Sequence, residues 1–251
     1  MGAPILLDVQ QIYLAFGGLL ALNGATLQLY QSEILGLVGP NGSGKTTLLN
    51  VISGQLRPTR GQLFLEQRAI QGLPPHRLAQ LGIARTYQIP RPFRSTTVLD
   101  NVALGLMFGR HSHSRAAALR QSVAILDFVG LRAKAHALAG QLNLHERKFL
   151  ELARALAVQP KVLLLDEVLA GLNPAEVELG IDLLRRIRER GITLLFVEHN
   201  LRAVQALCDR LVVLNYGQQI ATGVPSDVMN DPQVIAAYLG DERSAAHHVT
   251  N

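Results

Sequence analysis

The chain has 251 residues, of which 48% are apolar and 17% charged, and its net charge is +5. This composition excludes a disordered chain, and the length suits one domain with a substantial core. The Lys and Arg residues are scattered without a compact basic run, so the charge does not favour a nucleic acid as partner. The single cysteine, Cys208, excludes an internal disulfide and is typical of a reducing cytosol. No apolar run approaches the ~18–20 residues that span a bilayer, so we expect any membrane role to be peripheral.

The N-terminal third contains short strands around one glycine-rich stretch. Alternating apolar patches at residues 5–9 and 25–29 predict antiparallel strands, and the apolar run 34–38 predicts a buried strand. Residues 46–53 predict a helix. A strand or hairpin is expected at 61–70, before two prolines that break the chain ahead of a short helix.

Residues 39–47 read GPNGSGKTT and satisfy the phosphate-binding pattern G-x-x-x-x-G-K-[ST] in full. Glycines let backbone N–H groups curl around phosphate oxygens, and the N-terminus of the following helix would face those oxygens. Lys45 would place a charge on the β- and γ-phosphates, and the Thr46 hydroxyl would be a ligand for Mg²⁺. The sequence therefore predicts binding of a nucleoside triphosphate. The residues of this loop are Gly39, Pro40, Asn41, Gly42, Ser43, Gly44, Lys45, Thr46 and Thr47.

The residue pattern changes twice in the second half of the chain. Residues 98–157 are rich in alanine and in apolar residues at helical spacing, with a polar break at 109–114. From residue 161 onward, expected strands alternate with expected helices, which predicts a largely parallel sheet. We therefore expect an α/β nucleotide-binding core interrupted by a helical insert. The expected strands are 162–165, 193–197 and 211–214, and the expected helices are 175–190 and 201–207.

Polar residues follow two of these expected strands. Asp166 and Glu167 end the strand 162–165; the first carboxylate could orient Mg²⁺ and the second could polarise an attacking water. Such a pair alone often describes a surface turn, but beside a complete phosphate loop it favours a functional role. His199 follows the strand 193–197, and we interpret it as a γ-phosphate contact that also orients Glu167, although a lone histidine is more often structural. Gln88 on its own would be a solvated loop residue.

These motifs, in this order, resemble the ATP-binding cassette family over nearly the whole chain. The resemblance implies an α/β P-loop ATPase of the ABC type, with ATP and Mg²⁺ as cofactors. It implies one domain over residues 1–240, with an N-terminal antiparallel β-subdomain and an α-helical subdomain at about 89–158. Residues 241–251 would form a flexible tail.

Transferred position by position, the resemblance assigns roles to single residues. Phe16 would stack on adenine, and Gln88 would touch Mg²⁺ or the attacking water. His199 would be the switch histidine, and residues 91–93 would pass motion to membrane subunits. Glu167, His199 and Gln88 would thus be catalytic, Thr46, Gln88 and Asp166 would hold Mg²⁺, and Ala170, Gly171, Leu172 and Asn173 would form the D-loop.

Longer stretches resemble one group within the family. RTYQIPRPF, VEHNL and the C-terminal region from LCDRLVV to YLGDE are similar to ATPase subunits of bacterial branched-chain amino acid importers. Urea and short-amide importers belong to the same group and stay open as an alternative. The resemblance implies a second ABC ATPase subunit, two integral-membrane permease subunits and, indirectly, a periplasmic solute-binding protein as partners, and no nucleic acid. It also implies a peripheral location on the cytoplasmic face of the inner membrane.

One motif departs from the family pattern. Where the signature LSGGQ is expected, Asn143, Leu144, His145 and Glu146 replace Ser, two glycines and Gln. Asn143 and Glu146 keep the spacing of a capping box, so a helix can still begin there. Leu144 and His145 add bulk where a close backbone approach is usual. Glu146 must point away from the bound nucleotide, or binding at that half-site weakens.

The altered signature leaves alternatives open. The chain could form a homodimer, or it could be a binding-dominant cassette in an asymmetric heterodimer with a different ATPase subunit. A DNA-maintenance ATPase of the same superfamily is disfavoured, because the chain has no stretch of coiled-coil length. Val168, which follows Glu167 where the family usually has proline, is a lesser departure.

Overall fold

The computed structural model describes residues 3–247, which fall into two compact units. One unit is Met1–Leu73 with Leu195–Asn251, here called unit 1, and the other is Pro74–Leu194, called unit 2. β8 (Thr193–Val197) contains the point where the chain passes from unit 2 back into unit 1. Within residues 3–247, no helix has both the length and the apolar character needed to cross a membrane.

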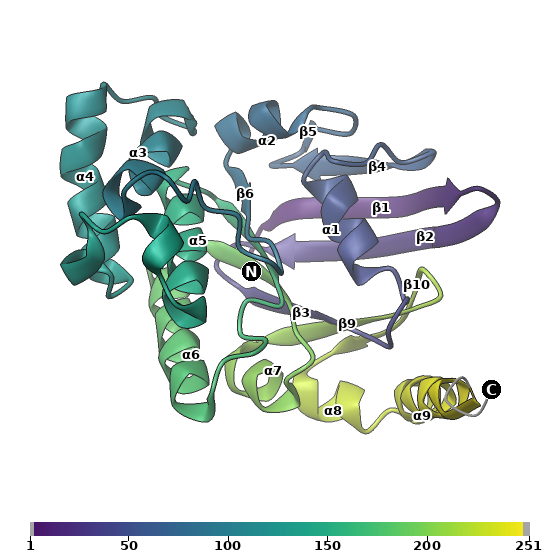
Figure 1. Cartoon of the computed structure of the whole chain (residues 1–251). Coiled ribbons are helices and arrows are strands. Elements are labelled where there is room, and N and C mark those ends of the chain that lie inside the picture. Colours follow the sequence, from purple (N-terminus) through teal and green to yellow (C-terminus); the bar gives the residue numbers. More distant parts are fainter. Residues whose placement is uncertain (1–2, 248–251) are drawn as a thin grey trace. The chain divides into compact units, whose positions relative to one another are not determined.

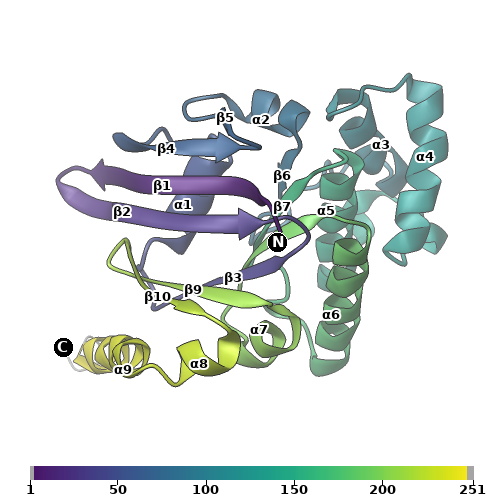
Figure 2. The same ribbon diagram turned by 180° about the vertical axis from the view of Figure 1, so that it is seen from behind.

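An antiparallel sheet forms the first part of unit 1. Its strands are β1 (Ile5–Phe16), β2 (Leu19–Tyr30), β4 (Arg60–Leu65) and β5 (Arg68–Ala69), in the order β2-β1-β4-β5. Figures 1 and 2 show β1 and β2 as the long hairpin at the start of the chain. Apolar residues alternate along β1, interrupted by a register shift between Val9 and Ile12, where Gln11 has a positive φ. The predicted antiparallel strands and the hairpin at 61–70 are confirmed.

A second set of strands in unit 1 carries the phosphate loop. β3 (Ile34–Val38) is buried at all five residues and pairs in parallel with β9 (Arg210–Asn215), which pairs antiparallel with β10 (Gln218–Gly223). A strand buried on both faces needs a continuous apolar run, as the sequence predicted. The helices of this unit are α1 (Lys45–Ile52), α7 (Leu201–Leu207), α8 (Pro225–Met229) and α9 (Pro232–His247).

The C-terminal region of the described chain is helical. We expected residues 241–251 to form a flexible tail; the structure places those up to His247 in α9, and their flexibility stays a prediction. Residues 248–251 lie outside the described part of the chain.

Unit 2 contains the helical section and a parallel strand pair. It begins with α2 (Pro75–Leu81), and β6 (Ile83–Arg85) pairs in parallel with β7 (Val162–Asp166). α3 packs against both α4 and α5 (Figure 1). The predicted helical insert and strand–helix alternation are confirmed, but the compact unit is broader than the expected 89–158. Its remaining elements are α3 (Val98–Phe108), α4 (Arg115–Phe128), two 3₁₀ turns at Arg132–Lys134 and Ala139–Gln141, α5 (Leu144–Ala157) and α6 (Pro174–Glu189).

Cys208 is the C-cap of α7, two residues before β9, and is buried against β3. A Cβ atom on Gly36 would lie 2.9 Å from its sulfur, so the strand and the thiol are in close contact. Burial, and to a smaller extent the charge of Asp209, raises the pKa of the Cys208 thiol to about 12.

We predict that Cys208 resists alkylation in the folded protein. A raised pKa keeps the group as the neutral thiol, which is a poor nucleophile, so a water-soluble thiol reagent at about pH 8 should leave it unmodified. The measurement is the mass of the intact chain after treatment, with and without denaturant. Rapid modification without denaturant would contradict this prediction.

Candidate nucleotide site

The phosphate loop connects β3 to α1 in unit 1, and its shape requires glycine. Gly39, Gly42 and Gly44 have φ values of 145°, 73° and 104°, in the region that side chains disfavour. A Cβ atom on Gly44 would lie 2.7 Å from the carbonyl oxygen of Ala21, and one on Gly39 would collide with the carbonyl oxygen of Leu214. The loop therefore packs closely against its neighbours while its backbone curls.

Lys45 is enclosed by this loop. Its side chain is buried, and its Nζ donates hydrogen bonds to the carbonyl oxygens of Gly39 and Pro40 at 2.8 and 2.7 Å. Gly44 is the N-cap of α1 and has no side chain to cap the first turn. A fixed ammonium and the N-terminal end of a helix thus belong to one curled loop, which suits an anion such as a phosphate group.

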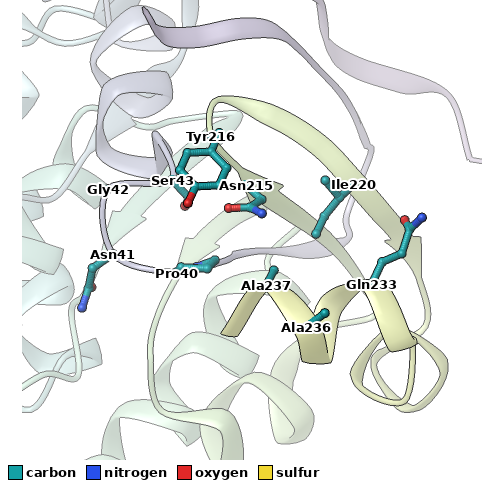
Figure 3. A pocket seen from close by; sticks show the side chains of 10 residues that line it. All are labelled: Pro40, Asn41, Gly42, Ser43, Asn215, Tyr216, Ile220, Gln233, Ala236 and Ala237. Atoms are coloured by element: carbon teal, nitrogen blue, oxygen red, sulfur yellow. The ribbon is translucent and has the colours of Figure 1, made fainter. Parts of the chain in front are cut away.

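A pocket of about 610 Å³ adjoins the phosphate loop in the same unit (Figure 3). The loop forms one side of it, the β9–β10 turn another, and α9 a third. Tyr238 of α9 is half-buried, which raises the pKa of its hydroxyl, and the Gly39 backbone near it lowers this pKa by a smaller amount. This contact of the C-terminal helix could not be predicted from the sequence. The lining residues are Pro40, Asn41, Gly42, Ser43, Asn215, Tyr216, Ile220, Gln233, Ala236 and Ala237.

Phe16 and His199 also belong to unit 1. Phe16 ends β1 at the β1–β2 turn and is 49% exposed, so its ring presents an open face. His199 follows β8 and is exposed, and its backbone N–H donates to the carboxylate of Glu198 at 3.2 Å. Glu198 itself is buried and was not singled out in the sequence. Asn200 then caps α7 by accepting a hydrogen bond from the Ala203 N–H.

In unit 2, Asp166 ends β7 and is paired with an arginine. Arg85 Nη2 lies 2.8 Å from Asp166 Oδ2, and both side chains are 5% exposed. Arg85 comes from β6, the parallel neighbour of β7, so the pair follows from strand pairing between distant segments. Sequence reasoning missed Arg85; the only available signal was a charged residue at the end of a short apolar strand.

Glu167 lies where the chain turns away from β7. Its φ is 48°, in the left-handed region, and this breaks the alternation of the strand. Its Oε2 accepts a hydrogen bond of 2.6 Å from Gln88 Nε2. The structure therefore brings together two residues that were assigned to catalysis from sequence. A third residue, Lys148 of α5, donates to the Glu167 carbonyl oxygen at 3.0 Å and was missed.

The D-loop follows this turn. The Ala170 N–H donates to the Glu167 carbonyl oxygen at 3.1 Å, and Gly171 has a φ of 74°. Asn173 is the N-cap of α6 and forms a capping box with Glu176. Leu172 and Asn173 therefore lead directly into α6.

The altered signature forms the N-terminus of α5. Asn143 Oδ1 accepts from the Glu146 N–H at 2.8 Å, and Glu146 Oε2 accepts from the Asn143 N–H at 3.0 Å, which confirms the capping box. Lys134 Nζ lies 3.3 Å from Glu146 Oε1. The carboxylate thus folds back over the start of its own helix and accepts from the Asn143 N–H, while the Asn143 side chain accepts from the Glu146 N–H. The capping box therefore occupies two N–H groups that could otherwise bind an anion.

His145 packs into the same helix. Its ring lies edge-on to Phe149, with 4.1 Å between ring centroids, and its buried Nε2 has no hydrogen-bond partner. Leu144 is 40% exposed. Both side chains that replace the glycines therefore add bulk to the turn where close backbone approach would be needed, and the His145 ring is held there by Phe149.

The side chains present suit Mg²⁺ better than a metal ion whose ligands all come from protein side chains. In residues 3–247, no three or more His, Cys, Asp or Glu side chains gather as a metal site. Mg²⁺ is commonly held by one or two carboxylates, waters and substrate phosphates. Within unit 2, two carboxylates follow each other at the end of β7: Asp166, in its ion pair with Arg85, and Glu167.

Two protein-family models match this chain. Residues 22–170 match the family model of the ABC transporter, and residues 218–244 match the model of the branched-chain amino acid ATP-binding cassette transporter. The first match covers more than half of the chain. The chain belongs to the ABC transporter family of ATP-binding cassettes, and it is an ATPase of that family.

Individual relatives are similar over almost their whole length. The high-affinity branched-chain amino acid transport ATP-binding protein LivG of Escherichia coli K12 is 38% identical over 94% of this chain and 98% of its own. BraF of Pseudomonas aeruginosa, a protein of the same description, is 36% identical over 96% of this chain and 100% of its own. The lipopolysaccharide export system ATP-binding protein LptB of Acidithiobacillus ferridurans is also 36% identical, over 94% of this chain and 98% of its own.

Solved structures of ATP-binding cassettes are similar to this chain over almost its whole length. The ADP conformation of MJ1267, an ATP-binding cassette of an ABC transporter, has a TM-score of 0.85 at 31% identity and covers 95% of this chain and 100% of that one. A nucleotide-free cassette from an ABC transporter has a TM-score of 0.84, also at 31% identity, over 92% and 98% of the two chains. The expected ABC-type α/β fold is confirmed.

We predict that the buried Arg85–Asp166 pair contributes strongly to stability. Changing Arg85→Met leaves the Asp166 carboxylate buried without its cation, which should lower the free energy of unfolding by about 3–5 kcal/mol. Chemical denaturation of the nucleotide-free protein measures this. The double change Arg85→Met with Asp166→Leu removes both charges and should recover most of the loss. A loss below about 1 kcal/mol in the single variant would contradict the prediction.

Proposed function

We propose that this chain binds and hydrolyses ATP to power an importer of branched-chain or other hydrophobic amino acids. The observation that carries the nucleotide assignment is the glycine loop closed around the buried Lys45 ammonium, in a chain that belongs to the ABC family. Phe16, with its open ring face, would stack on adenine.

The proposed solute rests on the C-terminal region and on the relatives. Residues 218–244, which form β10, α8 and much of α9, match a model described for branched-chain amino acid cassettes. LivG and BraF carry the same description. Identity alone does not decide the solute, because LptB of an export system is 36% identical. A urea or short-amide importer stays the alternative, and uptake of labelled leucine against labelled urea by cells with and without this chain separates the two.

The proposed chemistry assigns a distinct role to each candidate residue. Lys45 and the loop N–H groups hold the phosphates, and Thr46, Gln88 and Asp166 would hold Mg²⁺. The ion, when bound, neutralises charge on the β- and γ-phosphate oxygens. Glu167 accepts a proton from the attacking water, and Gln88 holds its carboxylate in place. His199 contacts the γ-phosphate, so it distinguishes ATP from the product ADP.

We predict that Glu167→Gln removes hydrolysis and preserves binding. Loss of a general base should lower kcat by about 10²- to 10⁴-fold, while the amide keeps the shape of the side chain and the ATP affinity. Phosphate release and the binding of a fluorescent ATP analogue are measured on the assembled cassette pair. Glu189→Gln, an exposed carboxylate at the end of α6, is the matched control. Undiminished turnover in Glu167→Gln would refute the assignment.

The partners follow from the same proposal. Two cassettes would pair head to tail, so that each ATP lies between one phosphate loop and the α5 N-terminus of the other chain. The pair would bind two permease subunits at the cytoplasmic face of the bacterial inner membrane, and a periplasmic solute-binding protein would deliver the solute to them. ATP closes the pair, and loss of the γ-phosphate lets it open.

The loop after Gln88 supports contact with a permease. Ile89 and Phe93 are 70% and 51% exposed, yet the loop is held firmly. Asn101 Oδ1 accepts from the Phe93 N–H at 2.9 Å, and Arg154 Nη1 donates to the Arg91 carbonyl oxygen at 2.9 Å. An ordered loop that exposes large apolar side chains suits a protein contact.

The altered signature supports an asymmetric heterodimer. Glu146 holds a negative charge at the α5 N-terminus, and Leu144 and His145 add bulk there. The site that this helix completes for a partner would be weak, whereas this chain's own phosphate loop and Glu167 remain suited to hydrolysis with an intact signature from a different subunit.

We predict low turnover for the chain alone and at least about tenfold higher turnover after addition of a second ATPase subunit with an intact signature. The combined change Leu144→Gly, His145→Gly and Glu146→Gln should raise the activity of the chain alone, because it removes the bulk and the charge. Steady-state ATP hydrolysis at matched protein concentrations measures both effects. Full activity of the unmodified chain as a homodimer would remove the need for a partner.

A further inference from the structure

Lys148 is a buried cation that none of the motifs includes. It lies in the second turn of α5 and is 4% exposed. Its Nζ donates to the carbonyl oxygen of Glu167 at 3.0 Å, across 19 residues of sequence. A charged donor makes a stronger hydrogen bond than a neutral one, and partial burial strengthens it further.

The accepting carbonyl belongs to a turn that needs support. Glu167 has a φ of 48°, a left-handed conformation that is unfavourable for a residue with a side chain. The Ala170 N–H donates to the same oxygen at 3.1 Å. At the side-chain end of Glu167, Gln88 Nε2 donates a hydrogen bond of 2.6 Å to the carboxylate. The turn and the carboxylate are thus fixed from both ends.

We propose that Lys148 is a positioning residue for hydrolysis, which holds the Glu167 turn so that the carboxylate points at the attacking water. This inference rests on the proposed role of Glu167 as general base. It also gives α5 a second role, because Lys148 follows Leu144 by one helical turn. A displacement of the α5 N-terminus therefore moves the donor that holds the turn, and a nucleotide that contacts that N-terminus affects hydrolysis in this chain's own site.

The test compares Lys148→Met with Lys148→Arg in the assembled cassette pair. Methionine keeps most of the volume but removes the charge and the donor, whereas arginine keeps both. We expect Lys148→Met to lower kcat by about 10- to 100-fold, because small misplacements of a reacting group have effects of this size. The KM for ATP and the Kd of a fluorescent ATP analogue should change by less than about twofold, and Lys148→Arg should recover most of kcat.

A matched control and a structural readout accompany the kinetics. Lys161→Met makes the same change just before β7, at the opposite end of the strand from Glu167, and should leave kcat unchanged. In nucleotide-free protein, hydrogen exchange at the Ala170 amide should accelerate in Lys148→Met, because that amide shares the Glu167 carbonyl. Unchanged exchange together with unchanged kcat would overturn the inference.

The double variant with Glu167→Gln separates the possible outcomes. If Lys148 acts through Glu167, adding Lys148→Met to Glu167→Gln should lower turnover little further. Full additivity, or an equal loss in melting temperature and kcat across all Lys148 variants, would show a general structural role and overturn the inference. If Glu167→Gln abolishes turnover while Lys148→Met is fully active, only this inference fails. If Glu167→Gln is fully active, the proposed function fails.

Discussion

The burial of the Lys45 ammonium group determines the conformation of the phosphate loop in unit 1. Lys45 is 6% exposed, and a buried cation is costly unless polar groups surround it. The carbonyl oxygens of Gly39 and Pro40 meet that need, but as dipoles they do not cancel the charge. To aim these oxygens inward the loop must adopt positive φ values, which is why glycines occupy its turning points. The same arrangement places a positive charge inside the loop that is proposed to bind the phosphates.

The signature helix illustrates how a short-range interaction can decide a long-range one. Two unit charges about 4 Å apart interact by about 4 kcal/mol at an effective dielectric of 20. A carboxylate at the α5 N-terminus is favourable for the helix itself, since it complements the helix dipole and completes the capping box. The benefit to the helix is local, whereas in the proposed cassette pair the cost would fall on an anion that belongs to another molecule. In that pair, stability and partner binding would favour different residues at position 146.

The sequence allowed much of the fold to be predicted because the relevant signals are local. Apolar runs predicted β3 and β7, and the capping-box spacing of Asn143 and Glu146 predicted the start of α5. The position of the phosphate loop followed from a single nine-residue stretch. Contacts between distant segments could not be predicted in this way: Arg85 meets Asp166 across 81 residues, and Lys148 meets Glu167 across 19. The orientation of Glu146 also depends on Lys134, from a 3₁₀ turn outside the motif. The extent of α9 was missed because its C-terminal part is polar.

Strand pairing also determines when, during synthesis, the phosphate loop can reach its folded conformation. β3, which leads into the phosphate loop, pairs with β9, and the Ile34 N–H donates to the Asp209 carboxylate across 175 residues. Contacts of such high sequence separation form late, because the intervening chain must be present first. A ribosome-bound chain therefore emerges with its phosphate-binding residues exposed early but unsupported. Unit 2 is continuous in sequence, whereas unit 1 is completed only by its C-terminal segment, so a truncated product would lack the strand that holds the phosphate loop.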